Sequence, residues 1–406
     1  MRKLVVAGHL DRPRAGLQPQ RQVGVESANA VVGPNLIRPR REPSPTLTVA
    51  LDELVDIARS ISATGQGVLK LVSDFVDVDA EFELCRQMAL ASGRPLSFTL
   101  AQVRGHTWRR QLALLSEAND EGRIMRGQVA PRAAGLLLGL QCTLNPFMGN
   151  AVYREIAGLP LHERVAIMRD PAFKAKLLEA VAATDRPRGL EDMTVVYELG
   201  DPPNYEPDPS HSIARRAEAI HRAPLELAYD LMLEGDGRAF LYLPLLNYND
   251  GNLDSTREML VHPRTVVGLS DGGAHVGTIC DASFPTTVLS HWGRDRPTGR
   301  IDVPFLVHRQ THATALAVGL LDRGVLAPGY RADINVIDLP ALRNRPPTMH
   351  YDLPAGGKRL LQGADGYVAT MVAGTITYEH GEAAGPLPGR LIRGPQPAPG
   401  AANGVT

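Results

Sequence analysis

The chain has 406 residues, of which 44% are hydrophobic and 21% are charged, and its formal net charge is −1. This composition is typical of one large globular domain or two domains, and it excludes a fibrous or wholly disordered protein. The balanced charge gives no reason to expect a nucleic-acid partner, and the apolar runs are far shorter than the roughly 18 residues that a membrane span requires.

The cysteines and the N-terminus bear on the cellular compartment. Cys85, Cys142 and Cys280 stand far apart in the sequence and form neither a disulfide framework nor a paired-cysteine metal motif. The apolar stretch at the N-terminus is too short for a signal peptide. We therefore expect a cytoplasmic protein with reduced cysteines and no membrane partner.

The amino-acid composition and the periodicity of the chain change near residue 47. Residues 1–46 are rich in arginine and proline and show no helical or strand periodicity, which predicts a disordered segment. Regular elements follow, with helices expected over 51–64, 81–93 and 108–122 and strands over 67–75, 94–102 and 123–132. Their alternation predicts parallel βαβ units with right-handed crossovers.

The second part begins with an insertion, 133–236, which holds short helical pieces and a proline-rich turn. A buried strand is expected over 239–248, and a second strand runs into a glycine turn over 265–275. We assign 47–328 to one α/β unit and 329–394 to a small β-rich portion. The composition of the tail, 395–406, predicts disorder.

Polar side chains follow the predicted strands at their carboxyl ends, where parallel βα proteins gather their functional groups. These residues are Ser73, Asp74, Gln102, Arg104, His106, Arg132, Asn247, Asp271 and His275. The sequence Ser-Asp-Gly-Gly places the Asp271 carboxylate directly after a buried strand, and its glycines permit a close approach of a ligand. The alternative is a plain turn in which Asp271 caps the next helix.

Three other motifs have structural interpretations. His308 and His312 lie four residues apart on a predicted helix, but without a third ligand a solvated helix face is preferred. His291 beside Trp292 is either a pocket edge or, more commonly, a packed neighbour of an aromatic ring. Cys280 would need a nearby base to act as a nucleophile, so a buried structural cysteine is preferred.

Two long segments carry a resemblance to a known family. They are GLSDGGAHVGTICDASFPTTVLSHW at 268–292 and QTHATALAVGLLDRGVLAPGYRADINVIDL at 310–339. Both resemble the C-terminal half of amidohydrolases, in particular the N-acyl-D-amino-acid deacylases, which are D-aminoacylase-like. The similarity extends over roughly 50–394. It implies an α/β fold built on a (β/α)8 barrel with a small β-sandwich, and a hydrolase that acts on C–N bonds other than peptide bonds.

The resemblance also implies a site. Metal-bound water would attack the amide carbonyl, and Asp271 would bind the metal and carry a proton to the leaving amine. Zinc is the implied cofactor, with His275 as a further candidate ligand. The implied substrate is a small N-acyl amino acid or a related amide. Arg104, Arg132 and Arg294 are candidate contacts for its carboxylate because arginine binds carboxylates in a bidentate manner.

The sequence departs from the family pattern in several respects. It contains no His-x-His pair, and Val72 and Leu100 stand near the positions where strand-end histidines are expected. Five candidate strands between 67 and 271 are fewer than the eight of a complete barrel, so we predict a partial barrel whose unpaired edge is compatible with a homo-oligomer. The alternative is an inactive, N-terminally truncated relative that is a fragment or a binding module. Thiol hydrolysis through Cys280 is a third possibility.

Overall fold

A five-stranded sheet lies at the centre of the protein. The computed structural model describes residues 3–7, 51–103, 105–182, 190, 192–268 and 275–400. The strand order in this sheet is β1-β2-β3-β4-β8, formed by Lys3–Ala7, Val68–Val72, Leu96–Leu100, Met125–Val129 and Thr265–Val267. β2, β3, β4 and β8 are parallel, and β1 is antiparallel to β2. The predicted parallel βαβ arrangement is therefore confirmed.

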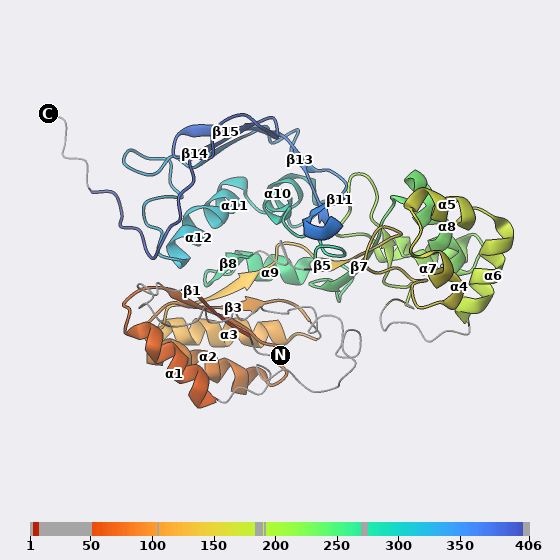
Figure 1. Ribbon diagram of the computed structural model, residues 1–406. Coiled ribbons are helices and arrows are strands. Elements are labelled where there is room, and N and C mark those ends of the chain that lie inside the picture. The colour runs from red at the N-terminus through yellow and green to blue at the C-terminus, as the bar shows by residue number, and fades with distance from the viewer. Residues whose placement is uncertain are drawn as a thin grey trace, which may run out of the picture.

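Three helices cover one face of this sheet (Figure 1). They are α1 (Leu51–Ser62), α2 (Val78–Ser92) and α3 (Thr107–Asp120). Alternate residues of β2, β3 and β4 are buried, and Leu71 and Phe98 belong to one apolar cluster with the three helices. The ring of Phe98 meets Phe82 of α2 edge to face, with 5.6 Å between the centroids. Burial of this apolar face anchors the helices to the sheet.

One predicted strand joins a different sheet. Residues 239–248 contain β7 (Leu241–Leu246), which pairs antiparallel with β5 (Ala134–Leu138) and β6 (Tyr197–Glu198). The position of the strand was predicted correctly, but its place in the parallel array was wrong, because a buried apolar run does not encode its partner. Among the described residues, the central sheet therefore contains four parallel strands, which is half the number in a complete barrel.

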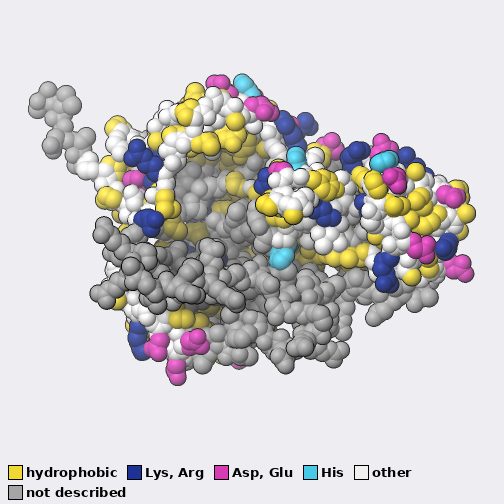
Figure 2. Space-filling view, viewed as in Figure 1, with side chains coloured by type: hydrophobic (Ala, Val, Ile, Leu, Met, Phe, Trp, Pro, Cys, Tyr) yellow, Lys and Arg dark blue, Asp and Glu magenta, His cyan; other side chains and the backbone are white. Residues whose placement is uncertain are grey.

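The insertion forms a helical lobe with an apolar cluster of its own. Its helices are α4 (Ala151–Ile156), α5 (Leu161–Met168), α6 (Pro171–Ala182), α7 (Ile213–Ala219) and α8 (Pro224–Gly237). Tyr229 of α8 is buried and donates its hydroxyl to the carbonyl of Met168, at 2.6 Å. Figure 2 shows side chains of both charge signs scattered over this lobe, as expected for a surface that faces water.

Helices of the second half lead into the small β-rich portion. The helical elements are α9 (Asp254–Val261), α10 (Phe284–Thr287), the π-helical η3 (Val288–Asp295), α11 (Val303–Gln310) and α12 (His312–Ala317). The strands are β9 (Ile334–Ile337), β10 (Arg343–Asn344), β11 (Thr348–Leu353), β12 (Gly357–Leu361), β13 (Ala364–Asp365), β14 (Tyr367–Val372), β15 (Thr375–Glu379) and β16 (Glu382–Ala383). Every helix in the described ranges is too short or too polar to cross a membrane.

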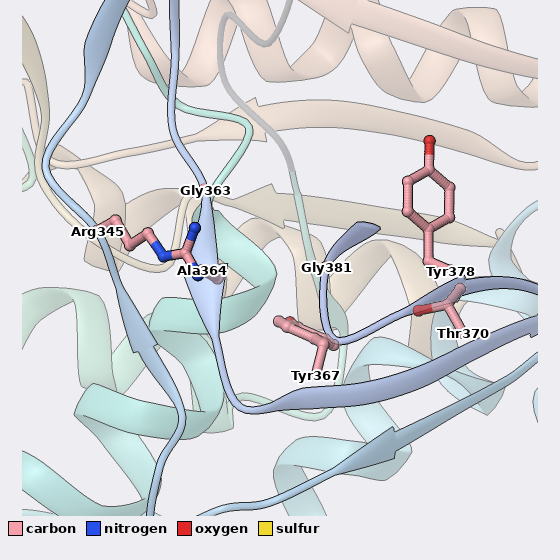
Figure 3. Close-up of a pocket in the computed structure, with 7 residues that line it drawn as sticks. All are labelled: Arg345, Gly363, Ala364, Tyr367, Thr370, Tyr378 and Gly381. Atoms are coloured by element: carbon pink, nitrogen blue, oxygen red, sulfur yellow. The ribbon is translucent and has the colours of Figure 1, made fainter. Parts of the chain in front are cut away.

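A small cavity of about 200 Å³ lies within this β-rich portion. Figure 3 shows Arg345, Tyr367 and Tyr378 around it. Asp365 accepts a hydrogen bond from Nε of Arg345 at 2.7 Å, so the charge of this arginine is already compensated within the protein. The hydroxyls of Tyr367 and Thr286 lie 3.0 Å apart, which connects the β-rich portion to α10. These contacts are those of a packed junction between two parts of the fold.

Both segments that were predicted to be disordered contain ordered parts. Lys3–Ala7 forms β1. The backbone of Gln396 in the tail donates to the carbonyl of Gly319 at 2.9 Å and accepts from Leu321 at 3.0 Å. Composition misses such pairing because backbone hydrogen bonds do not depend on side-chain chemistry. The remaining residues of these two predictions, 1–2, 8–46 and 401–406, lie outside the described residues.

Candidate functional site

Asn247 connects the carboxyl ends of two parallel strands. Its Oδ1 accepts a hydrogen bond from the backbone N–H of Gln102, after β3, at 2.8 Å. Its Nδ2 donates to the carbonyl of Ala130, after β4, at 3.1 Å. The backbone φ of Asn247 is +66°, a conformation that asparagine tolerates better than most residues. The end of β7 thus reaches the edge where the sequence predicted a functional site, although β7 belongs to another sheet.

The polar residues after β2 and β3 hold loops in place. Nε2 of Gln102 donates to Asp250 at 2.6 Å, and its Oε1 accepts from the backbone N–H of Asn249 at 3.1 Å. The hydroxyl of Ser73 donates to Glu81, whose carboxylate also accepts backbone N–H groups of the β2–α2 connection. These side chains therefore have partners within the protein.

Arg132, a predicted substrate contact, is buried after β4. Its guanidinium forms an ion pair with Asp281 at 3.2 Å and donates to the carbonyl of Cys280 at 3.0 Å. It also stacks on the rings of Tyr205 and Phe284, at 3.5 and 4.6 Å from their centroids. The side chain therefore ties segment 280–284 to the end of β4, and its charge is compensated by Asp281.

Arg294, a second predicted contact, is also occupied by protein groups. Its Nε and Nη2 donate to Asp295 at 2.5 and 2.9 Å. Its remaining bonds go to the carbonyls of Leu339, Pro340 and Leu342. Arg294 thereby connects η3 to the chain before β10. The third predicted arginine, Arg104, and the predicted catalytic residue Asp271 lie outside the described residues.

His275 is the predicted metal ligand that the structure describes. Its φ is +53°, and its carbonyl accepts the N–H groups of Thr278 and Ile279 at 2.8 and 3.0 Å. Its Nε2 is buried and has no hydrogen-bond partner among the described residues. A buried polar atom without a partner costs free energy, and a neutral imidazole nitrogen is a good zinc ligand.

The described residues as a whole do not fit a zinc site. Nowhere in them do three His, Cys, Asp or Glu side chains come together so that they could hold a metal ion. His308 and His312 have ring centroids 5.6 Å apart, but they lie on the separate helices α11 and α12 and bring no third ligand. Because zinc needs three or four protein ligands, His275 by itself is insufficient.

Cys280 has the chemistry of a structural cysteine. Its side chain is buried, and burial raises the pKa of its thiol to about 11. The thiol is therefore protonated at neutral pH, whereas a nucleophile or metal ligand must be a thiolate. This observation argues against thiol hydrolysis.

A cavity of about 480 Å³ opens beside Arg132. Its walls come from the loop 202–206, from η3 and from β10, and its lining includes Tyr205, Glu206, His291 and Arg343. Cavities of this volume hold small-molecule ligands in other proteins. Arg132 and Arg294, which were predicted separately, both line this one cavity.

Glu206 is the charged centre of this cavity wall, and the sequence analysis did not single it out. It accepts hydrogen bonds from Nη2 of Arg296 at 2.8 Å and from the backbone of Leu253 at 2.8 Å, and its Oε2 lies 2.7 Å from Nε2 of His291. Burial alone would raise the pKa of Glu206, but the hydrogen bonds from His291 and Arg296 outweigh it and lower the pKa to about 2. Glu206 is therefore ionised at neutral pH. The feature of the sequence that could have identified Glu206 was its position in the proline-rich turn of the insertion.

The chain is similar to solved structures of D-aminoacylases. One crystal structure, described as defining a novel subset of amidohydrolases, is 16% identical with a TM-score of 0.47 and covers 85% of this chain and 59% of its own. A mutant in complex with copper chloride is 16% identical with a TM-score of 0.49 and covers 86% and 61%. A third, concerned with the role of a binuclear metal centre, is 16% identical with a TM-score of 0.47 and covers 85% and 59%.

This chain thus spans about three fifths of the length of those structures. A comparison with curated proteins gives no significant match. The model of the amidohydrolase family matches residues 42–378, which is most of the sequence and includes the central sheet from β2 onward, the insertion and much of the β-rich portion. The chain therefore belongs to the amidohydrolase family.

Proposed function

We propose that the protein hydrolyses the amide C–N bond of a small N-acyl amino acid or a related amide, with Asp271 as the proton-transfer residue. Water would add to the carbonyl carbon while the Asp271 carboxylate accepts its proton. The C–N bond would then break as the proton passes to the leaving amine. Membership of the amidohydrolase family is the observation that carries this proposal.

The geometry of β8 supports the choice of Asp271. β8 pairs in parallel with β4, and the N–H of Gly268 donates to the carbonyl of Val129 at 2.8 Å. β8 therefore ends, at Val267, at the same edge of the sheet as β4, and Asp271 follows it by four residues in the sequence. A carboxylate that follows a parallel strand this closely suits general acid–base chemistry.

Metal content and hydrolysis test the proposal together. The purified protein is assayed for bound zinc by mass spectrometry and for amine release from N-acetyl amino acids of both chiralities. Asp271→Asn should reduce the rate at least about 100-fold, because general acid–base groups contribute on this scale. The control is Asp52→Asn, an exposed aspartate on α1, which should have no effect. Hydrolysis that persists unchanged in Asp271→Asn would refute the assigned role.

A second candidate function is a binding module without catalysis. It is favoured by the described residues, which supply no set of metal ligands. This candidate predicts that amides bind without turnover and that zinc does not copurify or restore activity. Cytoplasmic location and homo-oligomerisation stay predictions from the sequence.

A further inference from the structure

Among the described residues, one nitrogen of the His291 ring has a hydrogen-bond partner and the other has none. Its Nε2 lies 2.7 Å from Glu206, and its Nδ1 forms no hydrogen bond with any other described residue. Because Glu206 is ionised and accepts hydrogen bonds only, Nε2 of His291 carries the proton in this contact. The carboxylate therefore fixes both the ring orientation and the proton on Nε2. The other nitrogen is left for a partner in the cavity that His291 lines.

Glu206 is itself rigidly supported. Nε of Arg296 donates to its Oε2 at 3.0 Å and Nη2 donates to its Oε1 at 2.8 Å. Arg296 is buried and also binds Asp254 at 2.6 Å. The His291 ring is therefore held by a network of charged side chains that includes Glu206, Arg296 and Asp254. A group supported in this way keeps its geometry when a ligand enters.

Arg343 brings a second cation to the same cavity. Its Nε donates to Asp365 at 2.9 Å, whereas its terminal nitrogens bind no other described residue. Asp365 also accepts from Arg345 at 2.7 Å, so one carboxylate serves two guanidiniums. Arg343 is 61% exposed, which leaves its terminal nitrogens accessible. This corner of the cavity therefore has an excess of positive charge.

The other charged residues of the lining are compensated in place. Arg132 is paired with Asp281, and Arg294 with Asp295. The remaining lining includes Pro202, Pro203, Tyr205 and Leu253, which provide apolar and aromatic surface. A ligand that fits this combination has one anionic group and a hydrocarbon or aromatic part.

We propose that this cavity binds the carboxylate of a small N-acylated ligand, with protonated His291 donating through Nδ1, Arg343 donating through its terminal nitrogens, and Glu206 as the positioning residue of His291. The inference deepens the proposed function, because it names the group that would hold the substrate. Binding and amine release are separate measurements, however, so a protein that binds the ligand without releasing amine would refute the hydrolase proposal and leave this one standing.

The test compares two ligands that differ in one charge. Isothermal titration calorimetry at about pH 6, near the usual pKa of histidine, is carried out with N-benzoylglycine and with its uncharged amide, N-benzoylglycinamide. We expect the carboxylate to bind at least about tenfold more tightly, as one charge-assisted hydrogen bond provides. Equal affinities, or no binding of either ligand, would refute the proposal without any mutation.

Variants then assign the contacts. His291→Gln should reduce the affinity for N-benzoylglycine to that for the amide, whereas His308→Gln, an exposed histidine on α11, should leave both affinities unchanged. Native near-ultraviolet circular dichroism establishes that each variant is folded. A folded His291→Gln protein with wild-type affinity for the carboxylate would contradict the role of His291.

The role of Glu206 is separated from a merely structural one by the same two ligands. Because Glu206 acts on the ligand through the His291 ring, Glu206→Gln should weaken the binding of N-benzoylglycine and leave the affinity for N-benzoylglycinamide unchanged. In a protein that already carries His291→Gln, the same substitution should have no further effect. An equal loss for both ligands, or an effect that persists in the His291→Gln background, would refute the positioning role.

Discussion

Glu206→Gln should make the stability of the protein less dependent on acid. The pKa of Glu206 is about 2 in the folded protein, compared with 4.5 for a free glutamate. Between these two values the unfolded chain binds more protons than the folded chain, so stability falls as the pH is lowered through this window. A glutamine at this position binds no proton and cannot contribute to that loss.

The magnitude follows from the shift in pKa. A change from 4.5 to about 2 corresponds to at most about 3.5 kcal/mol. Glu206 borders a cavity and is 13% exposed, so solvent screens part of the interaction, and we expect about 1–2 kcal/mol. The wild type should therefore be more stable than Glu206→Gln by about this amount at pH 6, and most of the difference should be lost near pH 2.

Urea denaturation followed by circular dichroism at a series of pH values between about 6 and 2 measures this difference. Other ion-paired carboxylates also titrate here, so the comparison between wild type and variant carries the information. Glu179→Gln on α6 is the control, because Glu179 is exposed and a lone surface charge contributes little. A stability difference that stays constant down to pH 2 would show that the charge of Glu206 is not its source.

Three further predictions concern other buried groups. Burial lowers the pKa of Lys70 to about 7. Between about pH 7 and 10.5 the unfolded chain therefore binds more protons than the folded chain, and the stability of the wild type should rise with pH in denaturation experiments. Lys70→Met should lack this rise. Cys280→Ala should retain full hydrolytic activity, and native Cys280 should resist alkylation by iodoacetamide at pH 8, as mass spectrometry would detect. Phe98→Ala should cost about 3–5 kcal/mol in urea denaturation, because its ring is fully buried against α2; a loss below about 1 kcal/mol would contradict the assigned packing.

The sequence predicted the parallel sheet well because its signals are local. Alternating burial in β2, β3 and β4 and the helices between them follow directly from the spacing of apolar residues. α2 ends at Gly93, whose φ is +60°, because glycine adopts this conformation freely. The motif at 268–292 correctly identified the family.

Residue contacts between distant segments could not be predicted in this way. Glu206 and His291 are separated by 85 positions, and only the fold brings them within 2.7 Å. Likewise, the partner of β7 is decided by the approach of β5 from the other end of the insertion. Arg132 was singled out for its place at a strand end, but its function in the fold depends on Asp281, which no local pattern connects to it.

The inner face of the parallel sheet differs from the interior of a complete barrel. A closed barrel fills its interior with layers of bulky branched side chains. Here Nζ of Lys70 donates to Thr99 at 3.1 Å and to Gln128 at 2.6 Å, and Nε2 of Gln128 donates to Ser97 at 2.9 Å. These hydrogen bonds join three adjacent strands and satisfy one another without apolar packing. Such a network, together with the helices on the other face, gives this sheet lateral contacts and packing that do not require a closed barrel.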